Sequence, residues 1–268
     1  MELNALTILM GIAVVSIFGA VSMKMKIVNL SGLIAGFFVG LFVFIFGSWK
    51  WFTVILAFHL MAGIFTKYKY EAKKMKGAAE EMRGARAWGN VVANGGVAAA
   101  FSIMEGIIPN GIFFIGFLGA VSSALTDTLA TEIGLLYPSA PRIITNMKKA
   151  KPGTSGAISP LGELAIVMGA IAIGFISWSL GIINLDLQKL LLIALVSGFS
   201  GSTIDSLIGA TIQSLYKCQV CEKITEKRIH CNKPTTHVKG IRFFDNNMVN
   251  LVSTAFGATV AIFTYVVF

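Results

Sequence analysis

The chain is divided into long apolar stretches, each close to the length that a helix needs to cross a lipid bilayer. These stretches are residues 4–22, 29–48, 51–66, 88–107, 111–137, 160–183, 188–215 and 245–267. A spanning helix needs about 20 mostly apolar residues. Only 13% of the 268 residues are charged, against about 25% in soluble domains. The sequence therefore predicts an all-α fold, a polytopic integral membrane bundle of about eight spans that forms a single membrane domain over residues 1–268.

Several of these stretches depart from the standard length. Residues 51–66 are short, whereas 111–137 and 188–215 are long, so we expect some tilted, broken or re-entrant helices. Glycine-rich runs at 94–96 and 197–202 favour helix breaks or close packing. The first stretch has no basic segment before it and no clear cleavage site, so we interpret it as a retained span rather than a signal peptide.

The charged residues of the connections predict the orientation in the membrane. Residues 67–87 hold seven Lys or Arg and three Glu, residues 138–159 hold four basic residues and no acid, and residues 216–244 hold seven basic residues and two Glu. Eight crossings place all three connections on one side, which the positive-inside rule makes cytoplasmic. We therefore expect a multi-pass protein of the cell membrane with both termini outside. The overall positive charge belongs to these loops and does not indicate a nucleic-acid partner.

The segment Ser122–Gly134, SSALTDTLATEIG, carries two acids inside the fifth stretch. An acid within a membrane helix costs about 2.5–3.5 kcal/mol on insertion scales, so Asp127 and Glu132 need partners or a function. Asp205 and Asp245 stand near the same predicted face in two other stretches. Carboxylate oxygens beside phosphate suit Mg²⁺, so these four acids are candidate magnesium ligands. The alternative is that they pair with arginines or cap helices.

A basic connection rich in Gly, Ser and Thr lies between Pro141 and Ser159. Its backbone can aim N–H groups at an anion, and a helix starting near Pro160 adds a favourable dipole. Arg142, Lys148 and Lys151 supply positive charge. This composition suits a phosphate-binding loop, although the GxxxxGK[ST] pattern is absent. The alternative is a plain basic loop that obeys the positive-inside rule.

Three cysteines and two histidines lie close together in the last basic connection. Cys218-x2-Cys221, Cys231 and a histidine match the ligand types and spacings of a tetrahedral zinc site. We expect a structural Zn²⁺ held by Cys218, Cys221, Cys231 and His237, with His230 as the alternative fourth ligand. The other interpretation is reduced, unligated thiols.

At these motifs the chain resembles a membrane family that contains the phytyl-phosphate kinases of vitamin E biosynthesis and transmembrane protein 19. The matching segments are RAWGNVVANGGVAA (86–99), SSALTDTLATEIG (122–134), PRIITNMKKAKPGTSGAISPLG (141–162), GSTIDSLIGATIQ (201–213) and FFDNNMVNLVSTAFGA (243–258). They occur in order over about two thirds of the chain.

The resemblance implies a kinase that transfers the γ-phosphate of CTP to a prenyl monophosphate, with Mg²⁺ as cofactor, at a site facing the cytoplasm. The residues carried over from the matched motifs are Asn94, Asp127, Glu132, Arg142, Lys148, Lys151, Ser155, Asp205, Asp245, Asn246 and Asn250. We expect Asp127, Asp205 and Lys148 to be catalytic. Arg142, Lys151 and Ser155 would bind nucleotide phosphates. Asn94, Asn246 and Asn250 would orient phosphates or the cytosine ring, and the first three spans would hold the prenyl chain.

Two other functions remain open at this stage. Acids within spans and glycine-broken helices also fit an ion-coupled secondary transporter. A transferase acting on CDP-linked lipids would use similar groups, but the D-x2-D-G-x2-A-R pattern of that class is absent. The sequence leaves the prenyl chain length, the nucleotide and the formation of a homo-oligomer undecided.

Overall fold

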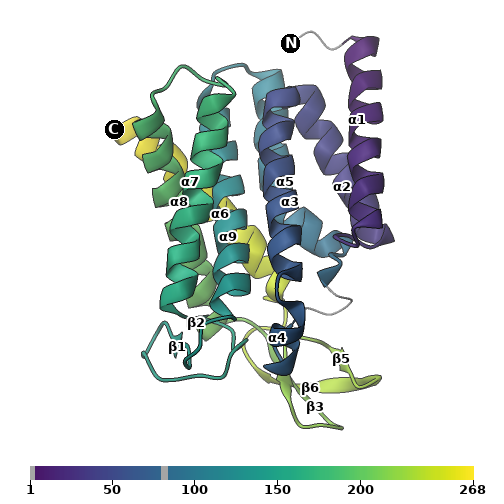
Figure 1. The fold of residues 1–268 in the computed structure, drawn as a ribbon, viewed down its shortest axis with the longest axis vertical. Coiled ribbons are helices and arrows are strands. Elements are labelled where there is room, and N and C mark those ends of the chain that lie inside the picture. The colour runs from purple at the N-terminus through teal and green to yellow at the C-terminus, as the bar shows by residue number, and fades with distance from the viewer. Residues whose placement is uncertain (1–3, 80–83) are drawn as a thin grey trace.

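The protein is a bundle of long helices with a small β region at one end (Figure 1). The computed structural model describes residues 4–79 and 84–268. The helices are α1 (Ala5–Lys24), α2 (Leu30–Phe42), α3 (Trp49–Lys67), α4 (Tyr70–Met75), α5 (Trp88–Ile107), α6 (Ile112–Gly134), α7 (Pro160–Ser179), α8 (Leu187–Thr211) and α9 (Asn246–Val267). A π-helical turn, η1 (Val43–Gly47), continues α2.

Seven described segments are long and apolar enough to cross a membrane, and they coincide with seven of the predicted spans. The eighth predicted span is α5, a helix of 20 residues that is not among these seven because it carries Asn90, Asn94 and Glu105. The predicted all-α membrane bundle is therefore confirmed. The predicted spans 111–137 and 188–215 were too long, since α6 ends at Gly134 and α8 at Thr211.

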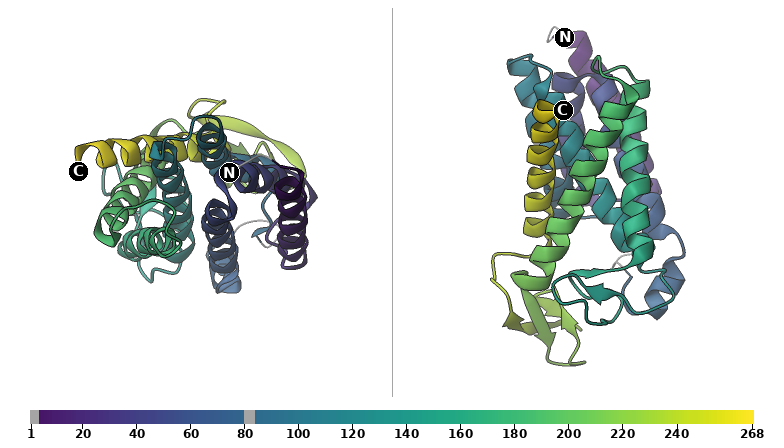
Figure 2. Two further views of the ribbon diagram at one scale, coloured as in Figure 1. Left: turned by 90° about the horizontal axis from the view of Figure 1, so that it is seen from above. Right: turned by 90° about the vertical axis from the view of Figure 1, so that its left-hand side faces the viewer.

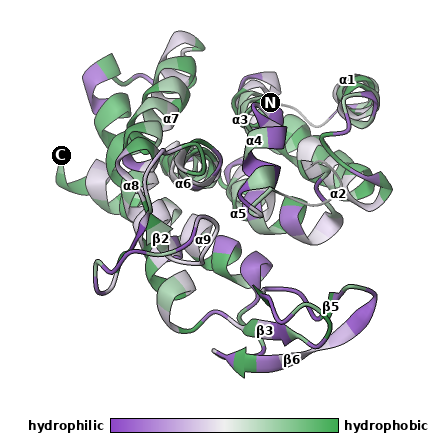
Figure 3. Ribbon diagram, turned by 60° about the horizontal axis from the view of Figure 1, so that its bottom comes forward, coloured by the Kyte–Doolittle hydropathy of each residue, from purple (hydrophilic) through white to green (hydrophobic). Residues whose placement is uncertain are grey.

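Helix α6 lies at the centre of the bundle, in contact with α3, α5, α7, α8 and α9 (Figure 3). Its side chains from Phe114 to Thr126 are all buried. Helix α1 lies at the edge of the bundle (Figure 2) and leaves most of its apolar side chains exposed. Exposing such an apolar face to water is unfavourable, whereas contact with lipid chains is not.

Small residues let α6 approach its neighbours closely. Gly198 and Gly201 of α8 pack against hydroxyl-bearing residues of α6, and a Cβ on Gly201 would collide with Ser123. The glycine run 94–96 does not break α5 either, since this helix continues from Trp88 to Ile107. Gly95 instead lets Val39 of α2 pack closely against α5. Of the two expected outcomes for the glycine runs, close packing is the one found.

All the basic connections lie at the same end of the bundle. Helix α4, the strand pair β1 (Arg142–Ile143) and β2 (Ala157–Ile158), and the strands β3 to β6 lie at this end, while α1 begins and α9 ends at the other (Figure 1). We call it the basic end. Of the charged residues counted in connection 67–87, Glu80, Glu81 and Arg83 lie outside the described residues.

The connection 216–244, expected to be a loop, forms a four-stranded sheet. Its strands are β3 (Leu215–Cys218), β4 (Ile224–Thr225), β5 (Ile229–His230) and β6 (Lys233–Lys239), in the antiparallel order β4-β3-β6-β5. Gly240 has a φ of +80° and lies against the carbonyl of Gln213, so glycine joins the sheet to the end of α8 where a side chain would not fit.

A substitution at Gly119 tests the close contact of α6 with α9. A Cβ there would lie 2.5 Å from the carbonyl oxygen of Gly257, so Gly119→Ala should force the helices apart and lower the free energy of unfolding by about 1–3 kcal/mol. Gly96→Ala is the matched control, because its Cβ would meet only Val92 at 3.6 Å. Unfolding of both variants in detergent measures the difference. Equal stability of the two would contradict the packing.

Candidate active site at the basic end

Two of the predicted acids lie next to each other on neighbouring helices. Asp127 of α6 accepts a hydrogen bond from Ser202 of α8 (3.3 Å), and Asp205 of α8 lies close enough to interact electrostatically with Asp127. The Oδ2 atom of Asp205 is buried and has no hydrogen-bond partner within the described part of the chain. Two carboxylates with an unsatisfied oxygen favour a cation between them.

The helix register brings two predicted asparagines to the same level of the bundle. Ser123 of α6 donates to the carbonyl of Ser253 in α9 (3.0 Å). Because these helices are antiparallel, Asn250 lies about one turn toward the basic end, level with Asp127. Thr254 of α9 donates to the carbonyl of Ala93 in α5 (3.2 Å), which places Asn94 nearby. Both asparagines are 7% exposed.

The other two predicted residues of α9 lie at its start. Asp245 is the N-cap of α9 and accepts the backbone N–H of Met248 (3.0 Å), so one of its carboxylate oxygens serves the helix. Asn246 is half-buried in the first turn. Among the described residues, no hydrogen bond or ion pair joins Asp245 to the Asp127–Asp205 pair.

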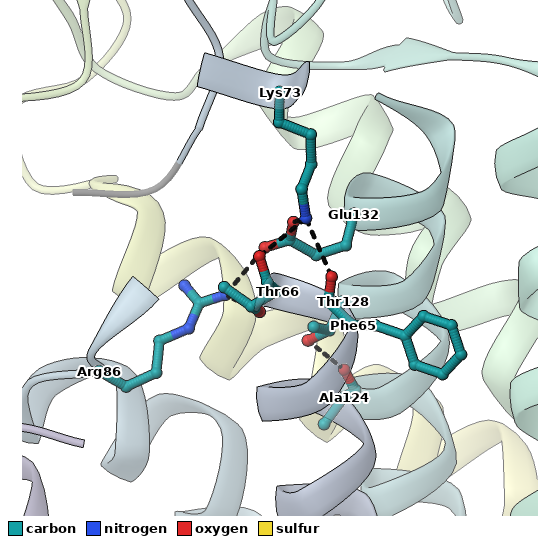
Figure 4. Close-up of polar contacts among 7 residues, drawn as sticks. All are labelled: Phe65, Thr66, Lys73, Arg86, Ala124, Thr128 and Glu132. Carbon is teal, nitrogen blue, oxygen red and sulfur yellow. Dashed lines mark hydrogen bonds and ion pairs between the residues drawn. The ribbon is translucent and has the colours of Figure 1, made fainter. Parts of the chain in front are cut away.

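Glu132 is paired inside the protein rather than open to a ligand. The ammonium of Lys73, on α4, lies 2.6 Å from its Oε2 atom and also donates to the carbonyls of Phe65 (2.9 Å) and Thr66 (2.8 Å) (Figure 4). Lys73 is 1% exposed and Glu132 3%. All three ammonium protons therefore have acceptors, as a buried lysine requires.

Arg86 links this ion pair to the acids. Its guanidinium Nη2 lies 3.6 Å from Oε1 of Glu132 and 3.5 Å from the hydroxyl of Thr66 (Figure 4). It is also close enough to Asp127 for an attractive electrostatic interaction. Arg86 thus stands between the Lys73–Glu132 pair and the Asp127–Asp205 pair. The sequence motif RAWGN contained it, but sequence reasoning assigned it no role.

The predicted phosphate loop crosses the end of α8. Gly156 has a φ of +73°, and a Cβ there would meet the carbonyl oxygen of Ser206 at 2.5 Å, so the loop backbone lies directly beside the turn that carries Asp205. Ser159 caps the start of α7, as the expected helix near Pro160 requires. Arg142 donates to the carbonyl of Met147 (2.8 Å), and its neighbours Lys148 and Lys151 are exposed.

A glutamate of the sheet joins the loop to the acids. Ser155 donates to Oε1 of Glu226 (2.6 Å), and the Glu226 carboxylate lies close enough to Asp205 for the two negative charges to repel each other. The sequence showed Glu226 only as one of two acids in a basic connection. Its position depends on the fold of the sheet, so no local pattern could have marked it.

An apolar cavity opens beside this polar cluster. It is formed by α1, α2, α3 and α5, and its lining includes Val15, Phe18, Leu33, Gly36, Phe37, Val39, Phe52, Leu56, Phe58 and His59. Its polar lining residues include Ser22 and His59, which contact each other, and Arg86, Asn90, Asn94 and Thr128. Arg86 connects the cavity to the acids through its electrostatic interaction with Asp127. We call this cavity the apolar groove.

The cysteine cluster differs from the prediction in one ligand. Cys218, Cys221, Cys231 and His230 bring their ligand atoms within 4.8 Å of one another. His237, predicted as the fourth ligand, is not in this group. It lies on β6 opposite Tyr216 and packs edge-on against that ring (5.3 Å between centroids). The choice of His237 was therefore wrong, because the pairing of β3 with β6 places it opposite Tyr216, two residues along β3 from Cys218, whereas His230 lies next to the β5–β6 turn that holds Cys231.

The thiols of this cluster are electrostatically unequal. A backbone hydrogen bond from Cys221 lowers the pKa of Cys218 to about 6, with a second one from Val220 acting in the same direction against the effect of burial. The side chain of Cys221 raises the pKa of Cys231 to about 11, and desolvation and the neighbouring thiols add to the rise.

Charged and amide side chains line part of the apolar groove. Arg86, Asn90 and Asn94 are among them, and Arg86 interacts with Asp127. The carboxylates of Asp127 and Asp205 are ligands of the type that Mg²⁺ prefers. The basic loop lies beside the turn that carries Asp205. The fold defines an integral membrane protein with a cluster of buried polar groups at its basic end.

Comparison with known proteins places the chain in a family. The family model described as "Integral membrane protein DUF92" matches residues 13–258, so the chain belongs to this family. It is 30% identical to Protein PGR of Arabidopsis thaliana over 255 residues, which cover 87% of each chain. No solved structure matches the chain.

Two further relatives come from different lineages. An uncharacterized membrane protein of Methanocaldococcus jannaschii is 28% identical, over 95% of this chain and 92% of that protein. Protein VTE6, chloroplastic, of Arabidopsis thaliana is 26% identical over 87% of this chain and 63% of that protein.

The buried ion pair makes a prediction about stability. Among the described residues, Lys73→Ala leaves Arg86 as the one cation beside the buried Glu132 carboxylate, and breaking such a pair costs about 3–5 kcal/mol. Adding Glu132→Gln should recover part of the loss. Lys74→Ala is the matched control, since its side chain is 67% exposed. Thermal unfolding in detergent reports the order, and an equal effect of Lys73→Ala and Lys74→Ala would exclude the pairing.

Proposed function

We propose that this protein is a membrane kinase that transfers the γ-phosphate of CTP to a prenyl monophosphate, giving the prenyl diphosphate and CDP. One observation carries the proposal, namely that Arg86, Asn90 and Asn94 line the apolar groove and that Arg86 also interacts electrostatically with Asp127 of the acid pair. A ligand with a long apolar tail and an anionic head matches both parts. The resemblance of the sequence motifs to phytyl-phosphate kinases supports the same class of substrate.

The acceptor would lie with its prenyl chain in the groove and its phosphate at the polar end. Burial of apolar surface contributes about 0.8 kcal/mol per CH₂ group, so a prenyl chain supplies much of the binding. Arg86 offers a planar, doubly donating partner to a phosphate. The amide of Asn94 donates to the carbonyl of Asn90 (2.9 Å), which orients its carbonyl oxygen for a second ligand.

The nucleotide would approach from the basic loop. Arg142, Lys148 and Lys151 are exposed at this end and can bind the triphosphate, with Lys148 offsetting the charge that develops during transfer. The backbone around Gly156 lies beside the turn that carries Asp205 and offers N–H donors. Ser155 would bind a phosphate oxygen by exchanging its present acceptor, Glu226. Asn246 and Asn250, at the start of α9, would orient the phosphates or the cytosine ring.

The metal ligands in this proposal are Asp127 and Asp205. The orphaned Oδ2 of Asp205 and the pairing of two carboxylates fit Mg²⁺, and Asp245 can offer the oxygen that does not cap α9. Glu132 is left out of this set, because Lys73 and Arg86 neutralise it. When bound by Asp127 and Asp205, Mg²⁺ would neutralise charge on the nucleotide phosphates.

The reaction needs alignment more than acid–base chemistry. A terminal oxygen of the prenyl phosphate attacks the γ-phosphorus, and the bond to the β–γ bridging oxygen breaks to release CDP. The acceptor is already ionised near neutral pH, so no strong general base is required. Positioning by Arg86 and the asparagines, and the cations of the loop, would supply the rate acceleration. The basic end would face the cytoplasm, where nucleotide is available.

Loss of either acid should abolish the transfer. Purified protein incubated with labelled CTP, Mg²⁺ and phytyl or geranylgeranyl monophosphate should form the diphosphate, and Asp127→Asn or Asp205→Asn should lower kcat by at least about 100-fold. Asp186→Asn is the matched control. Asp186 is the N-cap of α8, at the end of the helix away from Asp205. Its replacement removes a negative charge but keeps the cap, because asparagine caps a helix as well as aspartate does.

The same assay separates the alternatives. Absence of transfer, or full activity of both Asn variants, would refute the kinase. Uptake of an ion or solute into proteoliposomes without nucleotide would favour a transporter instead, and release of pyrophosphate would indicate a cytidylyltransferase.

The groove makes a separate prediction about the acceptor. Gly36 lines the groove, and a Cβ there would meet only Val91, at 3.9 Å. Gly36→Phe should fill the space and raise KM for phytyl phosphate by about tenfold or more, a loss of about 1.4 kcal/mol in binding. KM for CTP should not change, and Gly36→Ala should behave like the wild type. An equal rise for an acceptor of five carbons would show that the chain binds elsewhere.

A further inference from the structure

The sheet at the basic end has almost no apolar core of its own. Within residues 215–239, all of which the structure describes, the only buried side chains of hydrophobic type are Tyr216 and Cys218. The isoleucines and valines of these strands are largely exposed, and none of them belongs to the main core. Burial of apolar side chains cannot stabilise a unit of this size, which therefore needs a cross-link such as a bound metal or a disulfide.

The four ligand atoms at its tip have the spacing of a tetrahedral metal site. His230 Nδ1 lies 3.5 Å from Cys221 Sγ and 3.3 Å from Cys231 Sγ, and all four ligand atoms lie within 4.8 Å of one another. Zn–S bonds of about 2.3 Å and Zn–N bonds of about 2.0 Å at tetrahedral angles place sulfur and nitrogen about 3.5 Å apart. A zinc ion therefore fits the cluster with small adjustments.

The backbone of the turns that carry the ligands donates a hydrogen bond to a sulfur and adopts left-handed conformations. The backbone N–H of Val220 donates to Cys218 Sγ (3.4 Å), a contact that stabilises a thiolate. Glu222, Cys231 and Asn232 have φ of +58°, +52° and +56°. Left-handed backbone costs about 1 kcal/mol or more in non-glycine residues, so holding three of them there requires a compensating interaction.

The charge of the surroundings also suits the ligand set. Three thiolates and a neutral imidazole give a zinc complex of charge −1. The sheet carries Lys217, Lys223, Lys227, Arg228, Lys233 and Lys239. A net negative centre among basic residues is electrostatically favourable.

We propose that Cys218, Cys221, His230 and Cys231 bind one structural Zn²⁺ ion. All four positions are filled by the protein, which leaves no open position for a reacting ligand and distinguishes this site from a catalytic one. The ion cross-links the β3–β4 turn to the β5–β6 turn. It thereby fixes the sheet that presents Glu226 to Ser155 and Asp205.

The metal content of the purified protein tests the site without any activity assay. Full-length protein purified in detergent, without chelator and dialysed against metal-free buffer, should contain about one zinc per chain by mass spectrometry. Cys231→Ser and His230→Asn should reduce this to near zero. His237→Asn is the matched control and should keep its zinc, because His237 packs on Tyr216 outside the cluster.

A second measurement uses the wild-type protein and so does not depend on whether the variants fold. Wild-type protein stripped of metal and titrated with Co²⁺ alone should develop the visible bands of a tetrahedral thiolate site at one equivalent. Absence of zinc together with absence of these bands would overturn the proposal. Zinc retained by His230→Asn and lost by His237→Asn would overturn the ligand assignment. Since neither readout is phosphate transfer, the result is independent of the proposed kinase.

Discussion

The close packing of α6 against α8 and α9 is the constraint on which the rest of the structure depends. In a lipid environment helices gain little from apolar burial against each other, so association depends on tight contact and hydrogen bonds between helices. Here glycines remove the steric barrier, and Ser122, Ser123 and Thr126 donate to backbone carbonyls of α8 or α9 at 2.7–3.0 Å. The same contacts set the depth at which Asp127, Asp205 and Asn250 meet.

Charge balance divides the polar end into two parts. Lys73 and Arg86 neutralise Glu132, and the buried lysine has every proton satisfied. Within the described part of the chain, Arg86 is the one cation that attracts the Asp127–Asp205 pair, and Asp205 Oδ2 has no hydrogen-bond partner. Glu132 Oε1 also lacks a hydrogen bond, but it has the Arg86 guanidinium 3.6 Å away. A buried pair of acids left in this state is costly in the absence of a cation. This contrast separates a structural ion pair from the groups proposed to act on phosphate.

Sequence reasoning found most of the candidate site because membrane-embedded polar residues stand out against an apolar background. Asp127, Asp205, Asn94 and Asn250 were all visible in this way. Lys73 and Glu226 were hidden, since each looked like an ordinary charge of a connection. Arg86 stood in a motif that was noticed, but no role was assigned to it. Burial of Lys73 depends on how α4 folds back onto the ends of α3 and α6, which no local pattern records.

The sequence alone determined the class of protein, the number and place of its long helices within a few residues, and the gathering of its basic connections, because hydropathy and charge act locally along the chain. Only the tertiary structure decided which acids face each other, that the glycine runs pack rather than break helices, and that His230 joins the cysteines. Those outcomes depend on distances between segments far apart in the sequence. Spacing along the chain left both histidines possible, whereas the pairing of β3, β5 and β6 selected one.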